Sequence, residues 1–167
     1  MEPLDAEVVL LDLEGASARD GARLASHLEG KTVIDCSNVA NVKELRSGAA
    51  SIAEDLAREC PGAAVVKALN VITAAALRDV LKHGGAETRQ GYVSGYFCGD
   101  DDKARRTAAA LIEEAQLDPT DCGPLSNATL LEALGLLAHH LEAHAGPHFT
   151  IDVIRAHGDS SPLDHWM

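Results

Sequence analysis

The chain has 167 residues, of which 46% are hydrophobic but only 3% aromatic, and 26 acidic against 14 basic residues give a formal net charge of −12. This length is enough for one domain with one core. The negative charge argues against nucleic acid or an anionic membrane as a partner, since both attract clustered Lys and Arg. No basic apolar leader, no membrane-spanning apolar run and no C-x-x-C pair is recognisable, so we expect a cytoplasmic protein with reduced cysteines.

Strand-like and helix-like segments alternate along the chain. In the first part of the chain, the pattern predicts a strand over 7–13, a helix over 16–28, a strand over 31–36, a polar loop over 37–46 and a helix to residue 60 capped by Ser47. The middle part has a predicted strand over 65–69, a helix to about His83, a loop over 84–91, a strand over 93–98 and a helix from Asp100 to about 115. The last part has a predicted short strand over 118–122, a long helix over 126–144 and a last strand over 149–154. This alternation predicts an α/β fold with a mainly parallel sheet, a single domain over 1–155 and a flexible tail over 156–167.

Polar residues follow two of the predicted parallel strands directly. Asn70 comes after the strand over 65–69, and Ser37 and Asn38 follow the strand over 31–36. Ligands of open α/β sheets bind at the carboxyl ends of the strands, so these residues are candidates for a binding crevice. The alternatives are that Asn70 caps the next helix and that Ser37 and Asn38 only form a turn.

Three segments together resemble the NADP oxidoreductases that use the deazaflavin coenzyme (F-420), and they are also similar to the cytosolic reductase domain of the transmembrane metalloreductases. They are KTVIDCSNV (31–39), SGAASIAEDLARECPGAAVVKALNVITA (47–74) and CGDDDKARRTAAALIEEAQLDPTDCGPLSNATLLEALGLL (98–137). The second contains a Lys-Ala-Leu-Asn pattern where the family has Lys-Ala-Phe-Asn, with Leu69 in place of the aromatic residue. The resemblance covers roughly residues 7–140.

The resemblance implies a Rossmann-like fold whose first part is missing. The family begins with a strand and a Gly-x-Gly-x-x-Gly turn that holds the pyrophosphate of the cofactor at a helix start. This sequence has no such fingerprint, and strand 7–13 corresponds to the family's fourth strand. We therefore expect a truncated Rossmann-like domain that binds no cofactor tightly by itself, with NADP possible if the missing half is supplied.

Loss of the first three strands would leave strand 7–13 as an apolar open edge, which folded proteins avoid. The edge could be covered by the same strand of a second chain or by the chain's own strand over 149–154. We expect a homodimer that covers strand 7–13. A leucine stripe on the long helix supports this expectation; it consists of Leu130, Leu134, Leu137 and Leu141, widened by Leu131 and Ala138.

By the resemblance, Asn70 lies where the family positions the nicotinamide and the second substrate. We expect a small-molecule site there, lined by Ser37, Asn38, Val71 and Ile72. Ser126 and Asn127 match a Leu-Ser-Asn turn of the family and add an anion-friendly helix start, although helix capping alone would explain them.

Two carboxylates follow the first strand, namely Asp12 and Glu14. Like charges repel a pyrophosphate, but in a mostly apolar pocket carboxylates can act as general acid or base. The alternative is an ordinary solvated loop. Lys67 lies within a buried strand, where a lone lysine is costly, so we expect it to reach an edge or a carboxylate.

Histidines near the end of the long helix suggest a metal site at first sight. His140 and His144 are four residues apart and share a helix face, with His139 and His148 nearby. No Glu lies within the pair and no third ligand is evident, so we expect no metal there.

Two classes of function fit these observations. The first is a deazaflavin-type NADP oxidoreductase acting on a small organic molecule, in which another polypeptide supplies the phosphate-binding half or this chain is a fragment. The second is a cofactor-free cyclase, isomerase or lyase, for example of secondary metabolism, with Asp12, Glu14 and Asn70 as catalytic residues. A non-catalytic dimeric remnant is a third option.

Overall fold

The computed structural model describes residues 6–13, 23–45, 47, 50–83, 87–88, 91–146 and 150–151. Its strands are β1 (Val8–Leu11), β2 (Thr32–Asp35), β3 (Ala64–Ala68), β4 (Glu87–Thr88), β5 (Gly91–Tyr92), β6 (Ser94–Gly99) and β7 (Asp118–Asp121). Its helices are α2 (Ala25–Leu28), α3 (Val42–Leu45), α4 (Ile52–Glu59), α5 (Ala74–His83), α6 (Asp102–Glu114), the 3₁₀ turn η1 (Leu125–Asn127) and α7 (Ala128–Ala145). The predicted α/β class is confirmed.

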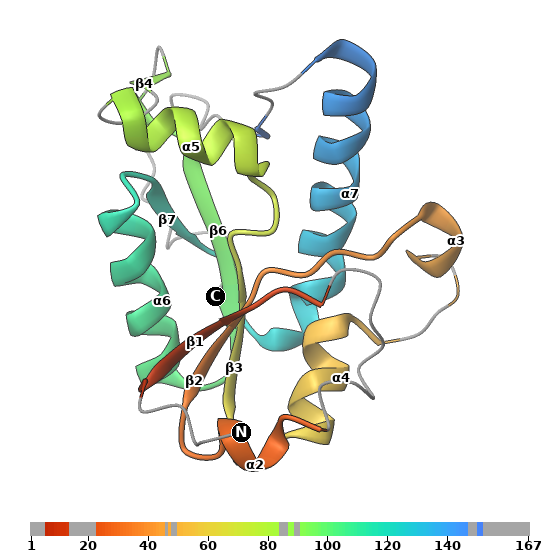
Figure 1. The fold of residues 1–167 in the computed structure, drawn as a ribbon, viewed down its shortest axis with the longest axis vertical. Coiled ribbons are helices and arrows are strands. Elements are labelled where there is room, and N and C mark those ends of the chain that lie inside the picture. The colour runs from red at the N-terminus through yellow and green to blue at the C-terminus, as the bar shows by residue number, and fades with distance from the viewer. Residues whose placement is uncertain are drawn as a thin grey trace, which may run out of the picture.

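Five strands form one sheet in the order β1-β2-β3-β6-β7 (Figure 1). The strands β1, β2 and β3 run parallel, and β6 and β7 are parallel to each other, but β6 pairs antiparallel with β3. The sheet is therefore mainly parallel, as predicted, with one reversal. The carboxyl ends of β1, β2 and β3 meet at the same edge, whereas β7 ends toward the opposite one.

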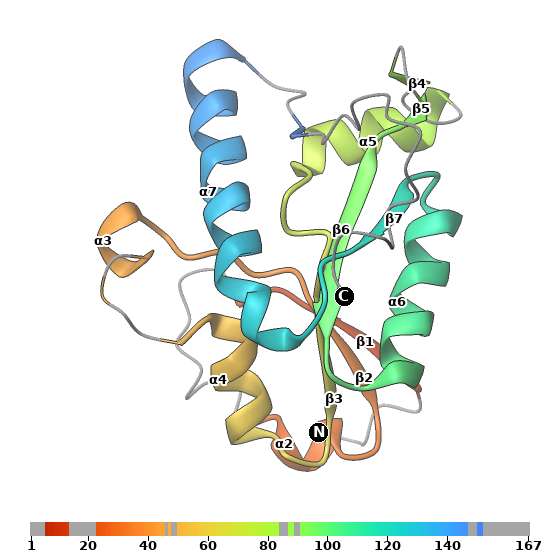
Figure 2. The same cartoon turned by 180° about the vertical axis from the view of Figure 1, so that it is seen from behind.

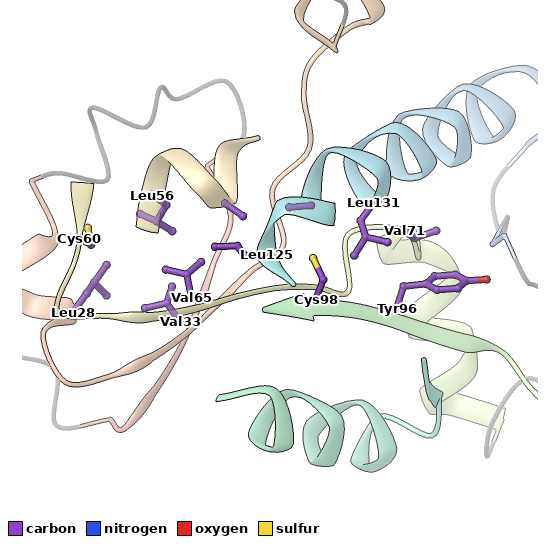
Figure 3. Close-up of a cluster of buried hydrophobic side chains, with 12 residues drawn as sticks. Leu28, Val33, Leu56, Cys60, Val65, Val71, Tyr96, Cys98, Leu125 and Leu131 are labelled. Atoms are coloured by element: carbon purple, nitrogen blue, oxygen red, sulfur yellow. The ribbon is translucent and has the colours of Figure 1, made fainter. Parts of the chain in front are cut away.

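Helices flank both faces of the sheet (Figures 1 and 2), and an apolar layer lies on each face. On one face, α2, α4 and α7 pack on strand residues such as Val33 and Val65; Figure 3 shows Leu56 and Leu131 directed toward this layer. On the other face, α5 and α6 pack on Ile34, Val66, Phe97 and their neighbours. Successive residues of a strand point to opposite faces, so the apolar runs in β2 and β3 supply both layers.

The cap predicted for α4 is wrong. Ser51, not Ser47, caps this helix: its Oγ accepts a hydrogen bond from the Glu54 backbone N–H (3.1 Å), and Glu54 Oε2 accepts one from the Ser51 N–H (3.0 Å). This reciprocal capping box satisfies two helix-start donors, which a cap four residues earlier could not do. Ser47 instead donates to the Glu44 carbonyl oxygen at the end of α3.

The segment predicted as a polar loop over 37–46 contains the one-turn helix α3. Asn41 starts it by accepting hydrogen bonds from the backbone N–H groups of Lys43 and Glu44 at 3.0 and 3.1 Å. The loop predicted over 84–91 likewise contains β4 and the first residue of β5, two short strands that pair antiparallel. Both elements are too short to produce a hydrophobic period.

The strand β1 lies at an edge of the sheet, the position predicted from the resemblance. The side chain of Leu10 is 60% exposed, while Val8, Val9 and Leu11 are half-buried. Of the strand predicted over 149–154, only 150–151 are described, and they are not in a strand. The rest of that segment and the tail over 156–167 lie outside the described residues. Within the described part of the chain, no helix is long and apolar enough to cross a membrane.

Candidate functional site

The structure brings Asn70 and Asn38 together at the carboxyl ends of β3 and β2. Asn70 Nδ2 donates to Asn38 Oδ1 (2.8 Å) and to the Leu131 carbonyl oxygen of α7 (2.7 Å). In return, Asn38 Nδ2 donates to the backbone carbonyl oxygen of Asn70 (2.8 Å). The amide pair therefore ties two strand ends and one helix together.

Asn70 does not cap the following helix, so that alternative is wrong. The helix α5 begins only at Ala74, and its start is served by Thr73 Oγ1, which accepts from the Ala76 N–H (3.3 Å). Asn70 is 3% exposed, and its Oδ1 makes no hydrogen bond with the described residues. A buried acceptor without a donor is uncommon and costs free energy.

The close approach of α7 to the amide pair depends on Gly135. A Cβ atom at this position would lie 2.1 Å from Asn38 Oδ1 and 2.7 Å from the Asn70 carbonyl oxygen. Only glycine allows the helix backbone to pass this near. The sequence analysis missed Gly135, although a glycine inside an otherwise apolar helix is a usable signal of close packing.

Leu69 gives the strand end its shape. Its φ is +60°, in the left-handed region that non-glycine residues seldom adopt. This conformation turns the chain sharply between the last residue of β3 and Asn70. Backbone strain of this kind costs about 1–3 kcal/mol and is often found at functional sites.

Lys67 reaches carboxylates, as expected from the sequence. Its Nζ donates to Asp35 Oδ2 (2.8 Å), to Glu132 Oε1 (3.0 Å) and to the Ser37 carbonyl oxygen. The lysine and both carboxylate side chains are at most 1% exposed. Lys67, Asp35 and Glu132, which we call the buried ion triad, were not foreseen as a group, because Glu132 is 65 residues from Lys67 in the sequence.

The buried ion triad fixes the strand ends beside the amide pair through its neighbours. Ser37, whose carbonyl oxygen binds Lys67, also accepts a hydrogen bond at Oγ from the Leu13 N–H (2.8 Å) and donates its own N–H to Asp35 Oδ1 (3.0 Å). Glu132 Oε1 additionally accepts from the Ile52 N–H at the start of α4 (2.9 Å). Three strand ends and two helices are thus fixed around one ammonium group.

Burial raises the pKa of the Glu132 carboxyl group above its ordinary 4.5. The Lys67 ammonium lowers it in part, and the Asp35 carboxylate raises it further. Two carboxylates share one ammonium group, so the triad has an excess of negative charge in a region from which water is excluded.

Replacing Glu132 by Gln should remove a pH dependence from stability. Because its pKa is higher in the folded state, Glu132 retains a proton that the unfolded chain releases. The resulting stabilisation is present below the unfolded pKa and is lost as the pH rises through the folded one. We expect the unfolding free energy of the wild type to fall relative to E132Q as the pH rises above the ordinary carboxyl pKa of 4.5, measured by urea titration. A constant difference between the two proteins over this range would contradict the assignment.

The other predicted site residues lie in several different places. Asp12 is exposed just beyond the carboxyl end of β1, at the same edge of the sheet as the amide pair. Glu14 lies outside the described residues. Val71 and Ile72 are buried, 4% and 8% exposed, and belong to the two apolar layers.

Ser126 and Asn127 lie in the turn η1 that precedes α7. Asn127 Nδ2 donates to the Cys122 carbonyl oxygen (2.6 Å), and Ser126 is exposed within η1. Neither side chain caps α7. Asn127 is four residues from Leu131, whose carbonyl oxygen binds Asn70.

His140 and His144 are held apart on α7. Their Nδ1 atoms contact the carbonyl oxygens of Leu136 (2.8 Å) and His140 (2.7 Å), and their parallel rings have centroids 6.4 Å apart. In this arrangement the Nδ1 atoms of both rings face backbone carbonyl oxygens of their own helix. Among the described residues, no three His, Cys, Asp or Glu side chains form a metal-binding group, while His148 lies outside them.

Cys36, directly after β2, is poorly suited to act as a nucleophile. Cys36 lies between Asp35 and Ser37, and burial, together with the neighbouring Asp35 carboxylate, raises the pKa of its thiol to about 12. Burial likewise raises the pKa of Cys98 to about 12. All four cysteines are free thiols, and a thiol that stays protonated at neutral pH is a weak nucleophile.

Comparison with known proteins gives three similarities. The chain is 37% identical over 113 residues to the metalloreductase STEAP3 of Rattus norvegicus, which covers 68% of this chain and 22% of that protein. The fold resembles a protein provisionally assigned as an F420-dependent NADP reductase from Arthrobacter sp. FB24, with a TM-score of 0.71 and 24% identity over 90% of this chain and 71% of the other. It also resembles the hypothetical protein SMa0349 from Sinorhizobium meliloti, with a TM-score of 0.58 and 27% identity over 73% of this chain and 58% of the other. No protein-family model matches the sequence.

The chain thus spans about a fifth of the length of the curated relative that it matches. The sequence similarity lies with a metalloreductase, and the fold is that of a protein assigned to the F420-dependent NADP reductases. The resemblance predicted from the three sequence segments is therefore confirmed: this chain is similar in sequence to part of a metalloreductase and has a Rossmann-like fold.

Proposed function

We propose that this chain forms the substrate side of an NADP-dependent oxidoreductase site, acting on a small organic molecule at the carboxyl ends of β1, β2 and β3. The observation that carries the proposal is that Asn70 and Asn38 contact each other at this edge of the sheet, where Asp12 follows the strand β1. The unused Oδ1 of Asn70 supports it, because a ligand amide N–H or hydroxyl group would supply the donor that this buried acceptor lacks.

The phosphate-binding half would come from further protein docked on β1. The sequence contains no Gly-x-Gly-x-x-Gly turn, and the similar reductase is longer than the region it shares with this chain. The helix α6 packs against β2, β3, β6 and β7. On the face of the sheet that α6 covers, Leu10 of β1 remains 60% exposed. Both the edge and the uncovered leucine suit an additional strand and helix. The free cysteines support a cytoplasmic location for this assembly.

A second candidate is an enzyme that kept the crevice but uses no cofactor, such as a cyclase, isomerase or lyase. The exposed carboxylate of Asp12 at the crevice favours this candidate. Its charge would repel a pyrophosphate, but it could transfer protons to and from a small organic substrate. Glu14 would assist it in the same role.

Fragments of NADP distinguish these two functions. We expect the chain to bind nicotinamide mononucleotide about as well as it binds NADPH and to bind 2′-phospho-ADP-ribose much more weakly, because only the nicotinamide end meets a preserved surface. Isothermal titration calorimetry measures all three affinities. Failure of both NADPH and nicotinamide mononucleotide to bind at about millimolar concentration, where the binding free energy is about −4 kcal/mol, would overturn the oxidoreductase proposal in favour of the cofactor-free enzyme.

The variant Asp12→Asn tests the role of the crevice charge. We expect D12N to strengthen NADPH binding, since it removes like-charge repulsion near the phosphates. Asp102→Asn is the matched control, because Asp102 is also exposed but lies on α6, away from the crevice. Equal effects of the two substitutions would indicate only a change in overall charge.

A further inference from the structure

Apolar side chains are exposed along the outer side of α7. Among the described residues, six large apolar side chains are exposed, and three of them lie on this helix: Leu130 (65%), Leu137 (50%) and Leu141 (37%). Leu134, between them, is half-buried. Their spacing of four, three and four residues places them on one stripe, which we call the leucine seam.

The helix therefore has two apolar sides. The inner side, with Leu131 and Ala138, is buried against the sheet, and Figures 1 and 2 show α7 at one side of the molecule with its far side turned away from the strands. A surface helix of a monomer ordinarily has charged residues on its outer face. Here the 18 residues of α7 include only Glu132, buried in the ion triad, and Glu142 as charged side chains.

The charge distribution favours a second copy of this chain as the occupant. Each chain carries a formal net charge of −12, so two copies repel each other wherever their carboxylates meet. The leucine seam is the exception, because the outer side of α7 exposes Leu, Ala and His rather than Asp or Glu. A stripe of leucines is also self-complementary, as a two-fold interface requires.

The neighbouring helix α3 extends the surface. It packs against α7, and its Val42 is 49% exposed. An 18-residue helix is about 27 Å long, so the seam and α3 together give a small interface compared with the roughly 800 Å² per partner of a standard complex. A dimer held by such a surface should dissociate reversibly on dilution.

We propose that two copies of this chain associate through the leucine seams of their α7 helices, around a two-fold axis. The inference does not rest on the proposed function, since the seam lies on the side of α7 opposite to Gly135 and the amide pair. The proposal places the homodimer contact on α7 instead of on strand 7–13, where it was expected. The edge of β1 then remains available to a different protein.

Three matched substitutions test the proposal: Leu137→Glu in the seam, Leu10→Glu on β1 and Leu81→Glu on α5. The three leucines are 50%, 60% and 50% exposed, and each substitution adds one negative charge, so the variants differ chiefly in location. The measurement is sedimentation equilibrium over a range of concentrations, with circular dichroism to show that each variant is folded. We expect a wild-type mass approaching twice 17.5 kDa, or 35 kDa, at high concentration.

In this experiment, L137E should remain at 17.5 kDa while L10E and L81E dimerise like the wild type. Leu130→Glu provides a second seam variant in case L137E is unfolded. Dissociation of L10E with an intact L137E dimer would place the interface at β1 and overturn the proposal, as would a wild type that is monomeric at all concentrations. Nicotinamide mononucleotide titrated into the same variants separates this result from the proposed function, because loss of dimerisation should leave that affinity unchanged.

Discussion

Replacing Lys67 by Met is expected to destabilise the protein by about 3–5 kcal/mol, the cost of leaving buried charge without its partner. The substitution removes the ammonium group that contacts Asp35 and Glu132 at 2.8 and 3.0 Å, while both carboxylates stay buried. Most proteins of this size are stable by only about 5–15 kcal/mol, so the loss would approach the whole stability of the fold. Urea unfolding followed by circular dichroism at neutral pH measures it.

The pH dependence of the stability loss in K67M provides a check on this explanation. The loss in K67M should shrink as the pH is lowered, because protonation neutralises the two carboxylates that the lysine no longer balances. Lys43→Met is the matched control, since Lys43 is exposed on α3 and its substitution should change stability little. A K67M protein as stable as K43M would mean that the buried ion triad contributes nothing to the fold.

Replacing Gly135 by Ala should also destabilise the protein, by about 1–3 kcal/mol, although alanine is the better helix former by about 1 kcal/mol. The added Cβ would lie 2.7 Å from the Asn70 carbonyl oxygen, a backbone atom that cannot rotate away, and 2.1 Å from Asn38 Oδ1. To relieve the overlap, α7 must move away from the amide pair. The same urea titration measures the effect, and the side-chain amide NMR signals of Asn38 and Asn70 should shift.

Ala143→Gly on the exposed part of α7 is the control for helix propensity, and it should cost about 0.5–1 kcal/mol. Alanine is thus expected to be favourable at position 143 and unfavourable at position 135 of the same helix. A stabilised G135A protein would show that the close approach of α7 to the crevice is not required by the fold.

The elements of the sheet could be predicted because each depends on a short stretch of sequence. The apolar runs that became β2 and β3 mark buried strands, and the residues Pro61 and Gly62 stop α4 just before β3 begins. The short helix α3 and the cap at Ser51 were missed, since a one-turn helix has no period and two serines lay close enough to compete. The reversal of β6 relative to β3 was also missed, because the direction of a strand is set by the chain path before it rather than by its own residues.

For the candidate site, the sequence placed Asn70, Asn38 and Ser37 at one edge, because parallel strands end together. It did not show what these residues contact. Asn70 appeared able to cap a helix, yet its amide instead joins Asn38, 32 residues away, and Leu131, 61 residues away.

Local composition and motifs were enough to predict the α/β alternation, the resemblance to the reductases, the lack of a phosphate-binding turn in this sequence and the need of Lys67 for a carboxylate. The folded arrangement was needed to show that Glu132 and Asp35 meet that need, that Gly135 admits α7 to the amide pair, and that the leucine stripe divides into a buried and an exposed side. Such contacts join residues far apart in the chain, and these residues come together only because the helices pack on the sheet.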